Sequence, residues 1–233
     1  MSFELFKTNM TTFFQNKNGS ASGIIPAEDM PVSDMIEIPD PQDPEKTIEV
    51  LDTDKELRKL ARKITDEYHL AIGTSIQQVR PINPTIYNNA MNPAKETIFL
   101  AILGVLTAMH SDKGPKPSVP LMLPIGAAVV TYWAAAMAPG AFSPLPPVLV
   151  SPTPAPGVIV LFPGNPKPIA KGFKDAFSKY DNERDFNIAT SKMLDDIIKG
   201  FKDHLASISG IYVGLSTSVP PLPIITPWKG ITV

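Results

Sequence analysis

The sequence predicts a mainly α-helical protein, a helical bundle with long irregular proline-rich extended arms and little β-sheet. Apolar residues recur at helical spacing in several separate segments, which indicates several amphipathic or buried helices. Of the 233 residues, 26 are proline, which fixes φ and removes a backbone donor. The hydrophobic content of 43% is nonetheless too high for a disordered chain. The proline-rich segments are therefore expected to be extended and to be buried, either within the chain or between chains.

Three regions are expected along the chain. The first is an N-terminal amphipathic helix, the second an acidic proline-rich arm or linker without a helical or strand period, and the third a helical domain with two proline-rich arms. Their boundaries are 1–16, 17–52 and 53–233, with the arms at 139–168 and 219–233.

Phenylalanines dominate the predicted N-terminal helix. Phe3, Phe6, Met10, Phe13 and Phe14 recur at helical spacing between polar residues. Such a stripe packs either on the core of its own chain or on a neighbouring subunit. Both interpretations stay open, and Phe3 and Phe6 are candidate interface residues.

Two helices are predicted in the middle of the chain. Thr53-Asp-Lys-Glu has the form of a capping box and opens a helix that is expected to end at Gly73. A second helix is predicted over residues 92–110, because Asn92 fits a helix cap and Pro93 fits the first helical position. This helix is apolar around most of its circumference, so we expect it to be buried in a core or an interface.

The stretch from Pro117 to Pro166 contains no Asp, Glu, Lys, Arg or His. A small-residue helix is predicted over residues 125–137, followed by a polyproline-like segment and a short strand at residues 158–162. Monomers rarely expose large apolar patches, so this segment is expected to be covered by protein. Helix is predicted again for residues 167–215.

The two proline-rich arms are the predicted contacts between subunits. Segments 143–156 and 219–233 lose little entropy on ordering and suit docking into grooves, although packing on their own core is the alternative. Trp228 is expected to be the best single anchor, because aromatic residues dominate interface energetics. The candidate interface residues of the arms are Leu145, Val148, Leu149, Leu222, Ile224, Ile225 and Trp228.

Composition and spacing argue against several kinds of chemistry. The formal net charge is −2, and the basic residues from Lys55 to Lys63 are interleaved with acids, so we expect no nucleic-acid partner. Cysteine is absent, and His69, His110 and His204 lie on three different predicted helices without metal-ligand spacing. No phosphate-binding loop or nucleophile motif occurs. We therefore predict a protein that is not an enzyme, with no catalytic, cofactor-binding or metal-binding residues.

The alternative function is that of a small membrane-associated protein with a helical hairpin at 93–138. A membrane-spanning helix needs ~20 apolar residues. The predicted helix at 93–110 is too short, and Pro120 and Pro124 interrupt the longer apolar window that follows. A membrane partner is therefore not favoured.

Four motifs resemble one family of proteins. They are FELFKTNMTTFFQN at residues 3–16, KITDEYH at 63–69, SPLPP at 143–147 and PPLPIITPWKG at 220–230. They are similar to motifs of small virion proteins of large contractile-tailed, T-even-like phages, including those of cyanobacteria. The resemblance covers both ends and the centre of the chain and skips residues 17–52, which look like an insertion.

The resemblance implies a non-enzymatic virion structural protein. It implies a component of the tail, baseplate, neck or capsid surface and does not choose among them. We favour tail, baseplate or neck over the capsid surface, and we expect assembly in the host cytoplasm. The expected partners are other virion structural proteins and copies of the chain itself.

Overall fold

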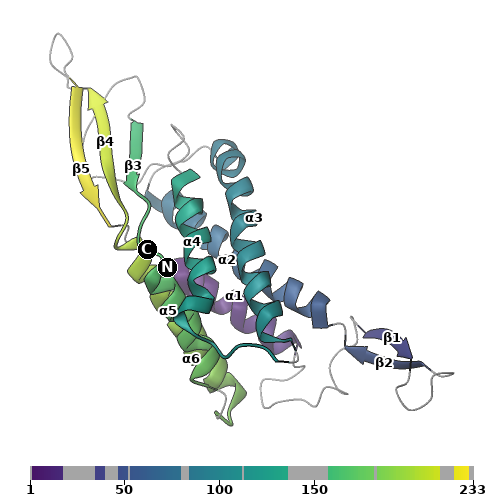
Figure 1. Cartoon of the computed structure of the whole chain (residues 1–233). Helices are drawn as coiled ribbons and strands as arrows, with labels where there is room; N and C mark the ends of the chain where they lie inside the picture. The colour runs from purple at the N-terminus through teal and green to yellow at the C-terminus, as the bar shows by residue number, and fades with distance from the viewer. Residues whose placement is uncertain are drawn as a thin grey trace.

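Helices dominate the structure, a computed structural model that describes residues 2–17, 35–39, 47–51, 53–79, 84–111, 113–135, 157–180, 183–215 and 223–230 (Figure 1). The helices are α1 (Ser2–Lys17), α2 (Thr53–Val79), α3 (Pro84–Met109), α4 (Val119–Ala135), α5 (Lys167–Ser178) and α6 (Phe186–Leu205). The strands are β1 (Met35–Pro39), β2 (Thr47–Leu51), β3 (Gly157–Phe162), β4 (Ser209–Leu215) and β5 (Pro223–Lys229). The prediction of a mainly α fold with little β-sheet is confirmed.

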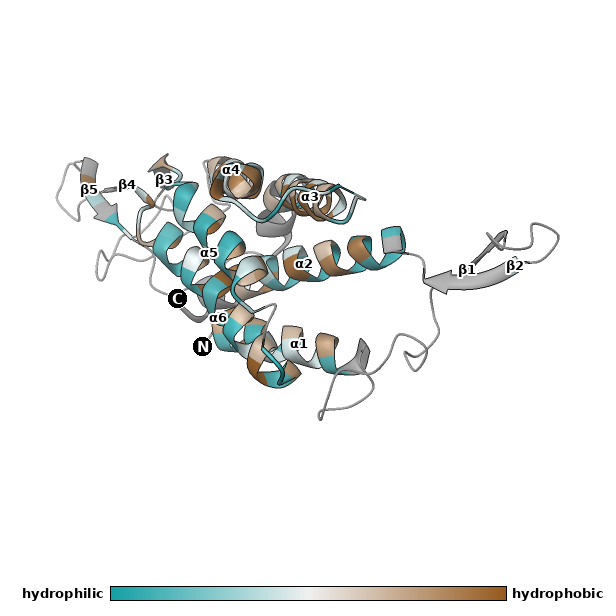
Figure 2. Ribbon diagram, turned by 60° about the horizontal axis from the view of Figure 1, so that its bottom comes forward, coloured by the Kyte–Doolittle hydropathy of each residue, from teal (hydrophilic) through white to brown (hydrophobic). Residues whose placement is uncertain are grey.

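The helices pack in a ring that follows the order of the sequence. Each helix contacts the next one along the chain, and α6 contacts α1 to close the ring. Figure 2 shows this arrangement, with α3 and α4 side by side as one layer and α1 on the opposite side of α2. Each amphipathic helix can therefore turn its apolar stripe inward, which is how a bundle buries its core.

Large aromatic side chains fill the middle of the ring. Tyr68 of α2 lies against Phe201 of α6, with ring centroids 4.4 Å apart, and against Tyr132 of α4 at 5.6 Å. The indole Nε1 of Trp133 donates a hydrogen bond to the Tyr68 hydroxyl over 2.8 Å. All four side chains are almost completely buried. This burial explains why the inner side of α4 carries no charge, because an unpaired charge there would be costly.

Two glycines let α5 and α6 approach closely. A Cβ atom on Gly172 would lie 2.6 Å from the Asp196 carbonyl oxygen, and one on Gly200 would lie 2.9 Å from the Pro168 carbonyl oxygen. Such contacts are too short for any side chain, so glycine at both positions sets the distance between the helices.

Three helices extend beyond their predicted ends. α2 continues past Gly73 to Val79, and α3 begins at Pro84 rather than at Asn92. Gly73 is buried, and packing outweighs its low helix propensity. Pro93 lies inside α3 and only removes one backbone hydrogen bond instead of starting the helix.

α4 begins at Val119, six residues before its predicted start. The Ser118 hydroxyl accepts a hydrogen bond from the Leu121 backbone N–H over 3.4 Å and caps the helix. Pro120 lies in the first turn, where no donor is needed, and Pro124 removes a single hydrogen bond.

A small antiparallel hairpin formed by β1 and β2 lies in the predicted arm at 17–52. Met35 pairs with Leu51 and Pro39 pairs with Thr47. The expectation that this region has no strand period is wrong for these two segments. Ile36 and Ile38, and likewise Ile48 and Val50, occupy alternate positions, which is the period of a strand.

The second sheet has the antiparallel order β3-β4-β5. The predicted short strand at 158–162 is confirmed by β3. Residues 209–215, predicted to be helical, form β4, where the β-branched Ile211 and Val213 favour a strand. Residues 223–229 of the predicted extended tail form β5, whereas the arm segment 143–156 and residues 219–222 lie outside the described residues.

Candidate functional site

The two candidate interface residues of the N-terminal helix lie in the core of their own chain. Phe3 and Phe6 are 2% and 0% exposed. Phe3 stacks on Phe201 of α6 with ring centroids 5.9 Å apart, and Phe6 meets the same ring edge-on. Packing on their own core was the alternative that the sequence left open, and the contact of α6 with α1 decides for it.

The candidate residues of the tail lie on β5. Ile225 is 63% exposed, and for Ile224 and Trp228 the structure describes only the backbone. The backbone of β5 pairs with β4 of its own chain. The contact of these side chains with neighbouring subunits stays a prediction, as does that of the candidates outside the described residues, Leu145, Val148, Leu149 and Leu222.

From Leu100 to the end of α3, and along α4, the outer side of the α3–α4 hairpin is exposed and uncharged; Glu96, one turn before Leu100, is also exposed and is paired with Arg62. α3 and α4 pack against each other and are joined by residues 110–118. Leu100 is 61% exposed and Leu123 is 36% exposed. We call this surface the uncharged face; its exposed members are Leu100, Gly104 and Thr107 of α3 and Leu123, Pro124, Ala127 and Thr131 of α4.

A glycine in the middle of α3 points to the same surface. A Cβ atom built on Gly104 would have no other atom within 4 Å. Glycine inside a helix costs about 0.5–1 kcal/mol relative to alanine. Packing within the described part of the chain therefore gives no reason for a glycine at this position.

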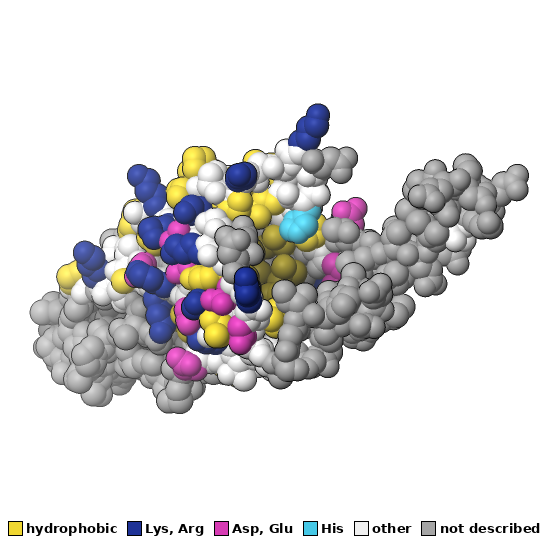
Figure 3. All heavy atoms as spheres, turned by 90° about the horizontal axis from the view of Figure 1, so that it is seen from below, with side chains coloured by type: hydrophobic (Ala, Val, Ile, Leu, Met, Phe, Trp, Pro, Cys, Tyr) yellow, Lys and Arg dark blue, Asp and Glu magenta, His cyan; other side chains and the backbone are white. Residues whose placement is uncertain are grey.

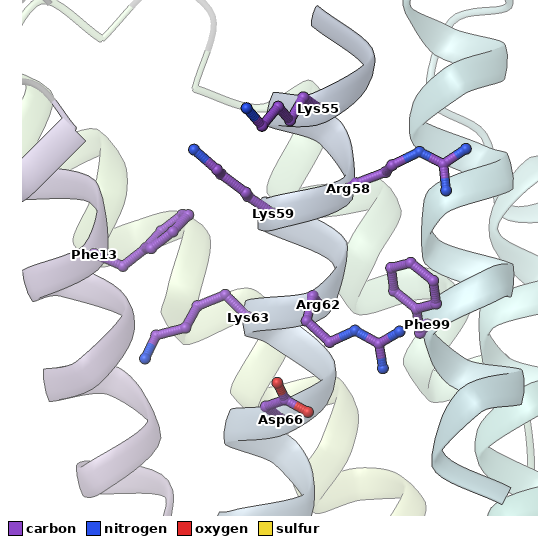
Figure 4. Close-up of a pocket in the computed structure, with 8 residues that line it drawn as sticks. All are labelled: Phe13, Lys55, Arg58, Lys59, Arg62, Lys63, Asp66 and Phe99. Carbon is purple, nitrogen blue, oxygen red and sulfur yellow. The ribbon is translucent and has the colours of Figure 1, made fainter. Parts of the chain in front are cut away.

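A groove lies on the outer side of α2, between α1 and α3 (Figure 4). Its volume is about 450 Å³. Phe13 of α1 and Phe99 of α3 form its two sides. We call it the basic groove, since five of its eight lining residues are cationic; the lining is completed by Lys55, Arg58, Lys59, Arg62, Lys63 and Asp66 of α2.

Ion pairs hold most of the cations of the basic groove. Arg62 binds both carboxylate oxygens of Glu96, over 2.6 and 2.9 Å, and its guanidinium lies 3.7 Å from the centroid of the Phe99 ring. The hydrogen bonds with Glu96 raise the pKa of Arg62 and lower the pKa of Glu96. Lys63 binds the buried Glu67 over 2.6 Å.

Arg58 differs from its neighbours in the basic groove. It is exposed, and among the described residues no ion pair or hydrogen bond holds its guanidinium. Figure 4 shows it on the side of α2 that faces Phe99. It is therefore available to a carboxylate from outside the ring, and guanidinium suits bidentate recognition of carboxylates.

The remaining charged clusters make contacts within the chain. A second hollow of about 460 Å³ beside the start of α5 includes Lys171, Lys174 and Asp175. Burial alone would raise the pKa of Asp175, but hydrogen bonds from Lys171, Lys179 and Lys174 outweigh it and hold that pKa well below its usual range. Figure 3 shows acidic and basic side chains interleaved over one face of the molecule.

The three histidines lie on α2, at the end of α3 and on α6, where each contacts a neighbour in the fold. His69 Nδ1 is 2.9 Å from the Tyr132 hydroxyl, and His110 Nδ1 is 2.9 Å from the Leu106 carbonyl oxygen. His204 is completely buried, with Nδ1 2.9 Å from the Asn165 carbonyl oxygen. In the described ranges, no three His, Asp or Glu side chains gather as metal ligands.

In the portion of the chain that the structure describes, no helix combines the length and the apolarity that a span requires.

No family model matches the chain, and no curated protein or solved structure is significantly similar to it. The uncharged face and the basic groove are therefore interpreted from the structure of this chain.

Sequence reasoning missed the basic groove. The run from Lys55 to Lys63 was visible, but its interleaved acids indicated a solvated helix face. The structure changes this interpretation for two reasons. Glu67 is buried, and Phe13 of α1 and Phe99 of α3 lie on the two sides of α2. No local signal in the sequence places those two aromatic rings beside α2.

Proposed function

We propose that the chain is a non-enzymatic virion structural protein of a tailed phage, which holds its place in the particle through contacts with other subunits. Tail, baseplate or neck is favoured over the capsid surface. The observation that carries the proposal is the uncharged face of α3 and α4, with Leu100 at 61% exposure and an unexplained glycine beside it.

The uncharged face has the properties of a surface that is buried in an assembly. Exposed leucines that are grouped with prolines, alanine and threonine offer apolar area without a desolvation cost for charge. Gly104 allows a neighbouring backbone to approach α3 closely. The partners are other virion structural proteins and copies of the chain, and assembly takes place in the host cytoplasm.

Three titratable groups of the described residues make structural contacts, and this supports the non-enzymatic part of the proposal. Asp175 is held by lysines, His204 supports a loop, and Asp195 binds Lys7 of α1 over 2.7 Å. Through these contacts, the three side chains stabilise the packing of the helices and of the loop before α5.

A membrane-associated function is the second candidate, and the α3–α4 hairpin favours it. The same uncharged face suits an apolar surface of lipid as well as one of protein. Carbonate extraction separates the two functions, because a virion subunit is released into the supernatant and a membrane-associated chain stays in the pellet.

Quantitative mass spectrometry of purified particles tests the proposed function. Particles of the phage that encodes the chain should contain it in a fixed ratio to the other structural proteins, across independent preparations. Presence in the lysate of infected cells together with absence from the particles would overturn the proposal.

A further inference from the structure

The hairpin of β1 and β2 stands apart from the ring. Its backbone contacts no other helix or strand that the structure describes. Figure 1 shows it beyond the start of α2, away from the helices. A two-stranded sheet is marginally stable at best when it is alone in water. The hairpin therefore gains stability from any surface that covers it.

The register of the hairpin places two like charges directly opposite each other. Glu37 pairs with Glu49 across the two strands. Like charges at this position destabilise a sheet, and a cation bound to both removes that cost.

The charge of the chain is divided between the arm and the rest. Residues 18–52 contain nine acidic residues and one lysine, a formal charge of −8. The whole chain has a formal charge of −2, so the remainder carries +6. Two copies can therefore attract each other through arm and ring although each is almost neutral as a whole.

We propose that the hairpin of one copy docks in the basic groove of a second copy. Glu37 and Glu49 of the first copy bind Arg58 of the second. When both copies exchange hairpins in this way, the contact closes a dimer with twofold symmetry. The inference rests on the proposed function, because it names one of the contacts between subunits that this function requires.

A second copy fits the groove better than the chain's own hairpin does. A single residue separates the end of β2 from the start of α2, and in this structure the hairpin lies beyond that end of the helix. Arg58 has no ion-pair partner in the described part of its own chain. The hairpin and the groove are thus both present in each copy and unpaired with each other.

Charge reversal on the two sides tests the proposal with the full-length chain. The hairpin variant carries Glu37→Lys and Glu49→Lys, and the groove variant carries Arg58→Glu and Lys59→Glu. Light scattering after gel filtration and sedimentation velocity give the mass of each. We expect a wild-type dimer whose affinity falls when NaCl rises from about 50 mM to about 500 mM, because salt screens exposed ion pairs.

Each variant alone should raise the dimer dissociation constant about a hundredfold or more, as the loss of close charge pairs does at other interfaces. Mixing the two variants should restore a dimer, since the reversed hairpin fits the reversed groove. The matched control, Lys113→Glu with Lys116→Glu, reverses two exposed charges in the α3–α4 loop and should leave the affinity unchanged.

Several results would overturn the inference. A wild-type chain that is monomeric at all concentrations would contradict the proposed dimer. A dimer that the hairpin variant weakens and the groove variant does not would contradict the proposed docking in the groove. Failure of the mixture to dimerise, with far-UV spectra that show both variants folded, also contradicts it. The proposed function is tested separately, because a monomeric chain that is present in purified particles keeps that function and loses only this contact.

Discussion

At the scale of the residue, His204 supports the loop that leads into α5. Its ring packs so closely on Gly164 that a Cβ atom there would lie 2.5 Å from Cε1, and Gly164 has a φ of 97°. Glycine is therefore required for both space and backbone conformation. Nδ1 donates to the Asn165 carbonyl oxygen, which leaves Nε2 as a buried acceptor without a hydrogen-bond partner among the described residues.

The stability of the protein should depend on the charge of His204. Burial lowers its pKa, more than the hydrogen bond to Asn165 raises it. As pH falls below about 6.5, His204 therefore binds a proton in the unfolded state before it does so in the folded state. Above that pH the ring is neutral in both states and the free energy of unfolding is not reduced. As pH falls from there toward the pKa of the folded state, the free energy of unfolding decreases by up to about 1.4 kcal/mol per pH unit.

Urea unfolding at pH 7 and pH 5 measures this dependence. His204→Asn keeps a donor for the Asn165 carbonyl and removes the titrating group, so it should flatten the profile between these pH values. It should also be less stable at pH 7, by about 1–3 kcal/mol, because the smaller side chain leaves a gap. Equal slopes for the wild type and the variant would show that His204 does not titrate on unfolding.

At the scale of the element, glycines with opposite surroundings give opposite predictions. Gly172→Ala or Gly200→Ala forces α5 and α6 apart and should lower the free energy of unfolding by about 1–3 kcal/mol. Gly104→Ala meets no neighbour within 4 Å and should raise it by up to about 1 kcal/mol, through better helix propensity.

Thermal and urea unfolding of the three variants decide between these outcomes. If Gly104→Ala destabilises the isolated chain, Gly104 contacts something within the fold and its place on the uncharged face is wrong. If Gly172→Ala is neutral, the close approach of α5 and α6 is not required.

The sequence predicted the helices well and their ends less well. Their apolar stripes identify the helices, because a buried stripe is a property of the element itself. Gly73 and Pro93 were interpreted as boundaries from local propensity, whereas the packing of α2 and α3 in the ring carries both helices through these residues. The apolar pattern predicts helix in place of the strand β4, because the apolar residues of β4 follow directly on the apolar stripe of α6.

The candidate surfaces were less accessible to sequence reasoning. The absence of charge from Pro117 to Pro166 did indicate apolar cover. Only the fold divides α4 into an inner side, with Tyr132 and Trp133, and an outer side with Leu123. In the same way, only the ring brings Phe13 and Phe99 to the two sides of α2.

At the scale of the whole molecule, the ring buries its aromatic residues inward and leaves different surfaces outward. The uncharged face lies on α3 and α4, and the basic groove lies on α2 between α1 and α3. A subunit with an apolar contact and an electrostatic contact on separate elements can bind two neighbours at once. This is the property that a repeated component of a particle needs.

Incorporation into particles tests the central claim most directly. Leu100→Asp with Leu123→Asp places charge on the uncharged face, and Leu5→Asp with Ile188→Asp places it on other exposed apolar residues, on α1 and α6. Each tagged variant is produced together with the wild type during infection, and mass spectrometry compares their ratio in lysate and in purified particles.

We predict that the uncharged-face variant is depleted from particles about tenfold or more, because burying an unpaired carboxylate costs several kcal/mol. The control variant should enter in proportion to its amount in the lysate. Equal incorporation of both variants would contradict the claim that this face holds the chain in the particle.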